Sequence, residues 1–158
     1  MAGERYIDKA VVKLAAYLSA NLPAKLRAVE TAQSMTANSL TDPVEVLDHR
    51  APFDNRSPLV ECFDESWDFV DLPNKMVSVD CTIALSYLGD ANLANGEKFM
   101  RRYSTALIEC LLADATLGGE VVAAIPTDGS SASARGDSSQ TRFIYTQGVD
   151  VRLHEGGS

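Results

Sequence analysis

Long apolar runs are missing from this sequence of 158 residues, although 46% of its residues are hydrophobic. No run approaches the ~20 consecutive apolar residues that a helix needs to cross a bilayer. The N-terminal stretch MAGERYIDKAVVKLAAYL places charges inside its apolar pattern, whereas a secretory signal has an unbroken apolar core. We therefore expect no export signal and no membrane partner. The length is typical of one domain, which predicts a single domain over residues 1–158.

Basic side chains are also few, because 14 Lys and Arg stand against 22 Asp and Glu, for a net charge of −8. Affinity for nucleic-acid backbones comes largely from Lys and Arg side chains that displace counterions. The acidic balance therefore opposes tight, sequence-independent binding of DNA.

Groups suited to nucleophilic or metal chemistry are scarce. The two histidines are His49, in a loop-like stretch, and His154, near the end of the chain, and neither stands beside a Cys or Ser in a catalytic arrangement. The acids between 61 and 71 lack the spacing of a calcium loop. We therefore expect no enzymatic activity, no cofactor and no metal. The three cysteines lie far apart in apolar runs: Cys62, Cys81 and Cys110. Their positions predict buried free thiols and a reducing compartment. The alternative is a small enzyme that uses one of these thiols.

Apolar spacing predicts two or three helices. Residues 4–20 repeat apolar side chains at intervals of three and four, and a second helix is expected to begin at Pro23 and to fade by Gln33. The main amphipathic helix is expected from Gly96 to about Ala115. Residues 34–58 are expected to be mostly loop, with one short apolar patch at 44–47.

Four segments have strand composition, and two of them alternate apolar and polar residues along their length: 59–63, 75–87, 120–125 and 141–153. The order of helices and strands predicts an α+β fold, with a mostly antiparallel sheet of about four strands and two or three helices packed on one face. Gly118 and Gly119 follow a helix and precede a strand, the reverse of a phosphate-binding loop, so we expect them to turn the chain.

Two connections attract attention as interaction sites. Residues 128–140 contain five serines and no large apolar side chain, which predicts a long flexible loop. Residues 64–75 are acidic and are expected to connect two strands, and their Trp67 and Phe69 are either interface anchors or local packing beneath the loop. Arg101 and Arg102 are either a solvated helix face or ion-pair donors to a neighbouring chain.

Three segments together resemble the tail terminator and tail-completion (neck) proteins of long-tailed bacteriophages. These segments are SPLVECFDESWDFVDLPNKMVSVDCTIAL, GEKFMRRYSTALIECLLADATLGG and the strand, loop and strand that follow. The closest points are Arg102-Tyr103, Ala106-Leu107-Ile108 and Thr116-Leu117-Gly118-Gly119. The likeness covers nearly the whole chain in element order and loose patterns, and it includes no catalytic signature.

The resemblance implies a non-enzymatic virion protein that forms a hexameric ring at the neck after assembly in the host cytoplasm. Such a ring caps the tail tube, joins the tail to the head connector or adaptor, and passes DNA without sequence-specific binding; the sheath protein is a further possible partner. In that setting Trp67 and Phe69 are expected as interface anchors and Arg101 and Arg102 as ion-pair donors between subunits. The 128–140 loop would be a docking arm, and it includes Arg135 and Asp137 of an Arg-Gly-Asp triplet that also matches a short adhesion motif. The alternatives are another neck protein, such as a head-tail adaptor or stopper, and a monomeric module that binds a host component through residues 64–72.

Overall fold

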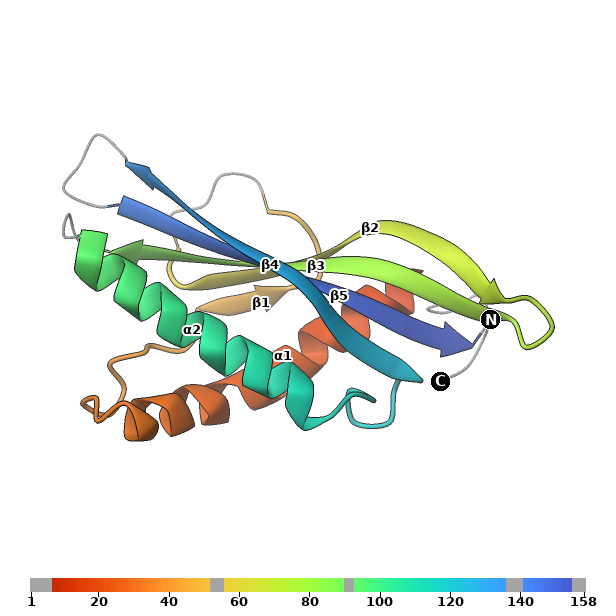
Figure 1. Ribbon diagram of the computed structural model, residues 1–158, viewed down its shortest axis with the longest axis horizontal. Coiled ribbons are helices and arrows are strands. Elements are labelled where there is room, and N and C mark those ends of the chain that lie inside the picture. The colour runs from red at the N-terminus through yellow and green to blue at the C-terminus, as the bar shows by residue number, and fades with distance from the viewer. Residues whose placement is uncertain (1–6, 52–55, 90–92, 136–140, 155–158) are drawn as a thin grey trace.

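A computed structural model of the chain describes residues 7–51, 56–89, 93–135 and 141–154 (Figure 1). Two helices and five strands follow one another in the order α1 (Ile7–Ala32), β1 (Glu45–Leu47), β2 (Leu59–Asp71), β3 (Met76–Gly89), α2 (Leu93–Ala113), β4 (Ala123–Arg135) and β5 (Thr141–His154).

The strands form one sheet in the order β1-β2-β3-β5-β4. Strand β1 pairs with β2 in parallel, and the other three pairs are antiparallel. The prediction of an α+β fold with a mostly antiparallel sheet is confirmed, and the sheet has five strands where about four were expected. The additional strand is β1, from the apolar patch at 44–47, which is part of the sheet because its backbone pairs with the adjacent edge of β2.

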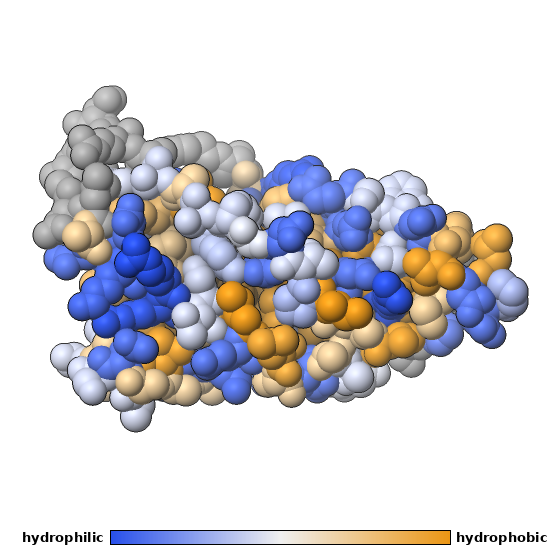
Figure 2. Space-filling model, in the orientation of Figure 1, coloured by the Kyte–Doolittle hydropathy of each residue, from blue (hydrophilic) through white to orange (hydrophobic). Residues whose placement is uncertain are grey.

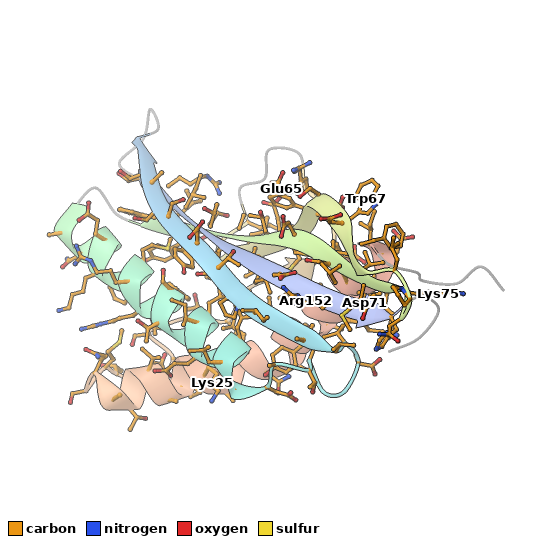
Figure 3. The ribbon with its side chains drawn as sticks, turned by 45° about the vertical axis from the view of Figure 1, so that its right-hand side comes forward. Lys25, Glu65, Trp67, Asp71, Lys75 and Arg152 are labelled. Carbon is orange, nitrogen blue, oxygen red and sulfur yellow. The ribbon has the colours of Figure 1, made fainter. Side chains whose placement is uncertain are left out.

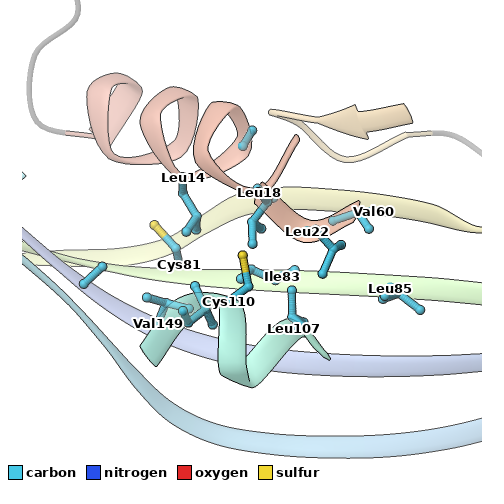
Figure 4. Packing of buried hydrophobic residues seen from close by; sticks show 14 of the residues in the cluster. Leu14, Leu18, Leu22, Val60, Cys81, Ile83, Leu85, Leu107, Cys110 and Val149 are labelled. Atoms are coloured by element: carbon cyan, nitrogen blue, oxygen red, sulfur yellow. The ribbon is translucent and has the colours of Figure 1, made fainter. Parts of the chain in front are cut away.

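Both helices cover the same face of the sheet, and the core lies between them and that face (Figure 4). Strand β5 alternates buried and half-buried residues along its whole length, as its sequence pattern predicts. Strand β3 buries the predicted residues from Val77 to Leu85, while Tyr87 is half-buried. The opposite face carries mostly polar side chains, as expected of an antiparallel sheet with one solvated face.

The first 32 residues form one helix where two were expected, because α1 continues through Pro23. Proline has no N–H to donate to the carbonyl four residues earlier, which is why it suggested a helix start. Burial outweighs that loss. An unbroken apolar stripe runs along α1 on both sides of the proline and is almost fully buried: Leu14, Leu18, Leu22, Leu26 and Val29.

Two predicted connections are strands. Strand β2 continues to Asp71, so the expected connection at 64–75 shrinks to a tight turn after that residue. Strand β4 includes most of the expected 128–140 loop, up to Arg135, and residues 136–140 lie outside the described part of the chain. In both cases the neighbouring strand supplies the backbone partners, so side chains without an apolar alternation still form a strand.

The two glycines after α2 turn the chain, as predicted. Gly118 and Gly119 have φ of 77° and 85°, in the left-handed region that glycine adopts without steric cost. The carboxylate of Asp114 accepts hydrogen bonds from the N–H groups of Thr116 at 2.9 Å and Gly118 at 3.0 Å. This turn directs the chain from the helix layer back to the sheet.

Candidate interaction surface

The aromatic side chains singled out in the sequence lie near the tip of the β2–β3 hairpin (Figure 3). Trp67 is 57% exposed and Phe69 is 48% exposed. They pair with Val79 and Val77, which are fully buried, so all four side chains belong to the helix-covered face of the sheet. The aromatic pair lies on the outer strand at this end, where cover by the helices is incomplete.

The end of this hairpin adds further exposed apolar area. Val70 is 44% exposed and Leu72 is 70% exposed. Figure 2 shows apolar atoms at the right-hand end of the molecule, where the hairpin lies. Exposed apolar groups that gather in this way, among polar neighbours, are typical of a surface that another protein covers.

The hairpin turn itself is well ordered by hydrogen bonds. The Asp71 carboxylate accepts a hydrogen bond from the side-chain amide of Asn74 at 2.6 Å, and the Asn74 carbonyl lies 3.1 Å from Nδ1 of His154. The second histidine, His49, lies in an exposed segment with its Nδ1 2.9 Å from the carboxylate of Asp48. The contact of each histidine thus fixes local geometry: His154 contacts the hairpin turn, and His49 contacts its neighbour Asp48.

Two acids of β2 have separate partners. Glu61 accepts a hydrogen bond from the N–H of Ala51 at 2.8 Å, and Glu65 pairs with Arg50 at 3.3 Å. Arg50 also lies over the ring of Phe63, 4.2 Å from its centroid. Across the residues that the structure describes, no group of three or more His, Cys, Asp or Glu side chains is placed to hold a metal ion.

The two arginines of α2 differ in their surroundings. Arg101 is on the exposed side of the helix and pairs with Glu97, one turn earlier, at 3.5 Å. Arg102 is half-buried, and no carboxylate in the described part of the chain lies within ion-pair distance of it. Arg135 ends β4, where its backbone pairs with Thr141, whereas Asp137 lies outside the described residues.

A groove lies between α2 and β4, with β5 as its floor, and the sequence alone did not predict it. Its volume is about 760 Å³, within the range of ordinary ligand pockets. One side is the α2 face that carries Arg101, Ser104 and Ile108, and the other is the serine-rich part of β4. The groove exists because Gly129 and the serines after it are too small to fill the space beside the helix. The signal for it in the sequence is therefore the run of small residues that was interpreted as a loop.

The three cysteines are free and buried, as predicted. Desolvation by burial raises the pKa of the Cys81 thiol to about 12 and that of Cys110 to about 11, and it also raises the pKa of Cys62. A thiol with a raised pKa is almost entirely protonated at neutral pH, and the protonated form is a poor nucleophile. This environment gives no support to the alternative of a thiol enzyme.

Among the described residues no helix combines the length and the apolar character that a membrane span requires. Comparison of the chain with protein-family models and with curated proteins gives no match.

Proposed function

We propose that this protein is a structural subunit of the bacteriophage neck, which assembles with copies of itself into a ring that caps the tail tube. In the family that the sequence resembles, this ring is hexameric and joins the tail to the head connector. The order of elements supports the proposal: a long helix, a strand hairpin, a central helix followed by the turn at Thr116-Leu117-Gly118-Gly119, and a final hairpin.

The observation that carries the proposal is the exposed apolar end of the β2–β3 hairpin. Trp67 and Phe69 lie about half exposed, with Val70 and Leu72 beside them. Aromatic side chains are enriched at protein interfaces, where they bury a large area at little cost in side-chain entropy. In a ring each contact is repeated around the axis, so an interface of modest size suffices for a stable assembly.

The charge of the chain supports a role around transiting DNA. The net charge is −8, and the open face of the sheet carries Asp68, Asp80 and Asp150, of which Asp150 pairs with Arg152 on the same face. An acidic surface repels phosphate, so DNA would move past it without being held. The partners that follow are the tail tube protein and the head-tail connector or adaptor, with the sheath protein in a tail that has one, and the site of action is the neck of the virion.

The experiment is light scattering coupled to size-exclusion chromatography, on the chain alone and after mixing with purified tail tubes, followed by negative-stain microscopy of the tubes. We expect a cyclic oligomer or a cap at one end of each tube. Trp67→Ala/Phe69→Ala should weaken this assembly, while Leu112→Ala, which removes an even more exposed apolar side chain from α2, should leave it unchanged. A chain that stays monomeric both alone and with tubes contradicts the proposal. A ring that binds the connector but not the tube indicates an adaptor or stopper.

A further inference from the structure

The sheet has two edges that pair with nothing beyond their own neighbour in the described part of the chain. Strand β1 pairs with β2 only at 59–61, so no described strand pairs with the outer side of β2 along 66–71. Strand β4 lies at the other side of the sheet and pairs only with β5. Open strand edges present unpaired N–H and C=O groups, which accept a further strand from another chain.

The two edges differ in chemistry. The β2 edge carries large aromatic side chains on its helix-side face and the acids Asp68 and Asp71. From Gly129 to Ser133 the β4 edge carries only small, uncharged side chains, all of them exposed. Proteins usually protect an edge strand with charged residues or proline. Pro126 and the irregularity between it and Gly129 lie before this stretch, which leaves the stretch itself without such protection.

The groove lies directly beside the unprotected edge. Gly129, Ser131 and Ser133 pair with Gln147, Tyr145 and Phe143, whose side chains are buried on the helix-covered face. The helix-side residues of β4 are therefore the small ones that line the groove. A large side chain from an added strand would pass over them toward α2.

We propose, building on the ring proposed above, that residues 66–71 of one copy pair with residues 129–135 of the next, and that Trp67 and Phe69 enter the neighbour's groove between α2 and β4. The partner that fills the groove is thus a second copy of this chain. The contact is head to tail, because it joins two different surfaces, and a head-to-tail contact closes into a ring when the rotation allows it.

The sides and directions of the strands agree with this pairing. Trp67 and Phe69 lie on the helix-covered face of β2, and the groove lies on the same face of β4. Strands β2 and β4 run in opposite directions within one sheet. Copies related by rotation about a ring axis would therefore join β2 to β4 in antiparallel fashion, the pairing with the better hydrogen-bond geometry.

The two segments lie at opposite ends of the sheet, which sets a stagger between copies (Figure 1). Asp68 pairs with Ser78 of β3, which pairs with Arg152 of β5. Ser131 of β4 pairs with Tyr145 of β5. Arg152 and Tyr145 are seven residues apart along β5. At ~3.4 Å per residue the stagger is about 24 Å. A stagger of this kind tilts the strands relative to the ring axis, as in closed barrels.

Charge favours the unlike pairing over pairing of like edges. Two β2 edges would bring Asp68 and Asp71 of one copy against the same carboxylates of the other, which is destabilising. The groove of the neighbouring copy has Arg101 on its α2 side, and the side chain of this arginine is 75% exposed. Asp68 and Asp71 pair with Ser78 and Met76 on the open face of the sheet, so they lie away from this arginine. The preference for the unlike pairing therefore comes from the avoided contact between carboxylates.

The first test fills the groove. Ser131→Arg places a long side chain in it, and Ala132→Arg makes the same change on the opposite face of the same strand. We expect Ser131→Arg to raise the dissociation constant of the assembly at least ~30-fold, the effect of losing an interface hot spot, and Ala132→Arg to change it far less. Circular dichroism of both variants checks that the subunit is folded. Equal effects of the two variants, or no effect of either, overturn the inference.

The second test joins the two edges by disulfides under mild oxidation with copper phenanthroline. Directly opposite residues on paired strands have Cα atoms within the reach of a disulfide. We expect a mixture of Trp67→Cys protein with Ser131→Cys or Ser133→Cys protein to give a covalent dimer. The mismatched mixture with Ala132→Cys, on the other face, should give none. The double variant Trp67→Cys/Ser131→Cys should give a ladder of multimers.

The outcomes separate this inference from the proposed function. A ring that forms without these cross-links overturns the pairing and leaves the ring proposal standing. Cross-linking of Trp67→Cys protein with itself, or of Ser131→Cys protein with itself, indicates pairing of like edges and overturns the head-to-tail contact. A chain that stays monomeric under every condition overturns both.

Discussion

Arg27 and Glu30 form an ion pair on the last turns of α1, with Nε of the arginine 2.8 Å from Oε1 of the glutamate. Glu30 is only 2% exposed. Its carboxylate also accepts hydrogen bonds from the N–H groups of Asn38 at 3.0 Å and Leu40 at 2.7 Å. One buried side chain thus ties the end of the first helix to the segment that leads into β1.

Replacement of Glu30 is expected to lower the stability of the whole fold. Glu30→Gln retains the volume but removes the charge from three hydrogen-bonded partners, which should reduce the free energy of unfolding by about 1–3 kcal/mol. Glu30→Ala also leaves the N–H groups of Asn38 and Leu40 without an acceptor, while Arg27 keeps its ion pair with Asp42, and it should cost about 3–5 kcal/mol. Urea denaturation measures both values. Glu109→Gln, on an exposed position of α2, is the control and should lie within about 0.5 kcal/mol of the native protein.

The same carboxyl group predicts a loss of stability in acid. Burial by itself would raise the pKa of Glu30, but hydrogen bonds from the backbone of Leu40 and Asn38, together with Arg27, outweigh it and lower the pKa. A lowered pKa in the folded state means that the unfolded chain takes up the proton first as the pH falls. The contribution is therefore complete above the unfolded value of ~4.3 and is lost as the pH falls through the folded pKa. Between pH 6 and pH 3 the native protein should lose more stability than Glu30→Gln, and parallel curves for the two would show that Glu30 does not carry the effect.

The three thiols are expected to be almost unreactive in the folded protein. Burial raises their pKa values, to about 12 for Cys81 and about 11 for Cys110, so little thiolate forms at pH 8. Ellman's reagent should label the native chain far more slowly than the chain in urea, where three thiols should react. Rapid labelling of one cysteine in the native protein would contradict the packing described above and would revive the alternative of a thiol enzyme.

The turn after α2 should tolerate asparagine better than alanine. Gly118 has a φ of 77°, and a Cβ at this position would meet no atom within 4 Å, so the cost of a side chain is conformational alone. Gly118→Ala should reduce the free energy of unfolding by about 1 kcal/mol. Gly118→Asn should cost less, because asparagine visits the left-handed region more readily. Thermal unfolding of the two variants measures the difference, and equal values would show that the turn relaxes out of this conformation.

The elements with strong apolar periodicity could be predicted from the sequence. Strands β3 and β5 and helix α2 each bury one face. Their apolar residues therefore recur at every second position in the strands and at every third or fourth position in the helix. The glycine turn was also predictable, because few residue types occupy that backbone conformation. These features depend on local sequence alone.

The features that depend on a neighbour were predicted less well. The serine-rich half of β4 has no apolar alternation and is a strand because β5 pairs with it. The outer part of β2 was interpreted as a connection for the same reason, which placed Trp67 and Phe69 in a loop where the structure has an exposed strand edge. No local pattern marks Glu30, because its backbone partners come from a segment eight to ten residues later. The groove beside β4 depends on how α2 crosses the sheet, which no local pattern specifies.

The strand order also determines where the backbone is held most firmly. Strands β3 and β5 lie at the centre, with a neighbour on each side and 14 residues each. Their amide protons should exchange with deuterium only in global unfolding events, whereas those of residues 66–71 and 129–135 should exchange through local opening. The subunit would thus combine two slowly exchanging central strands with edge segments that open at little energetic cost. On assembly, the two edge segments that are proposed to pair with neighbouring copies would then gain protection from exchange. The exchange of β3 and β5, which position these segments, would stay unchanged.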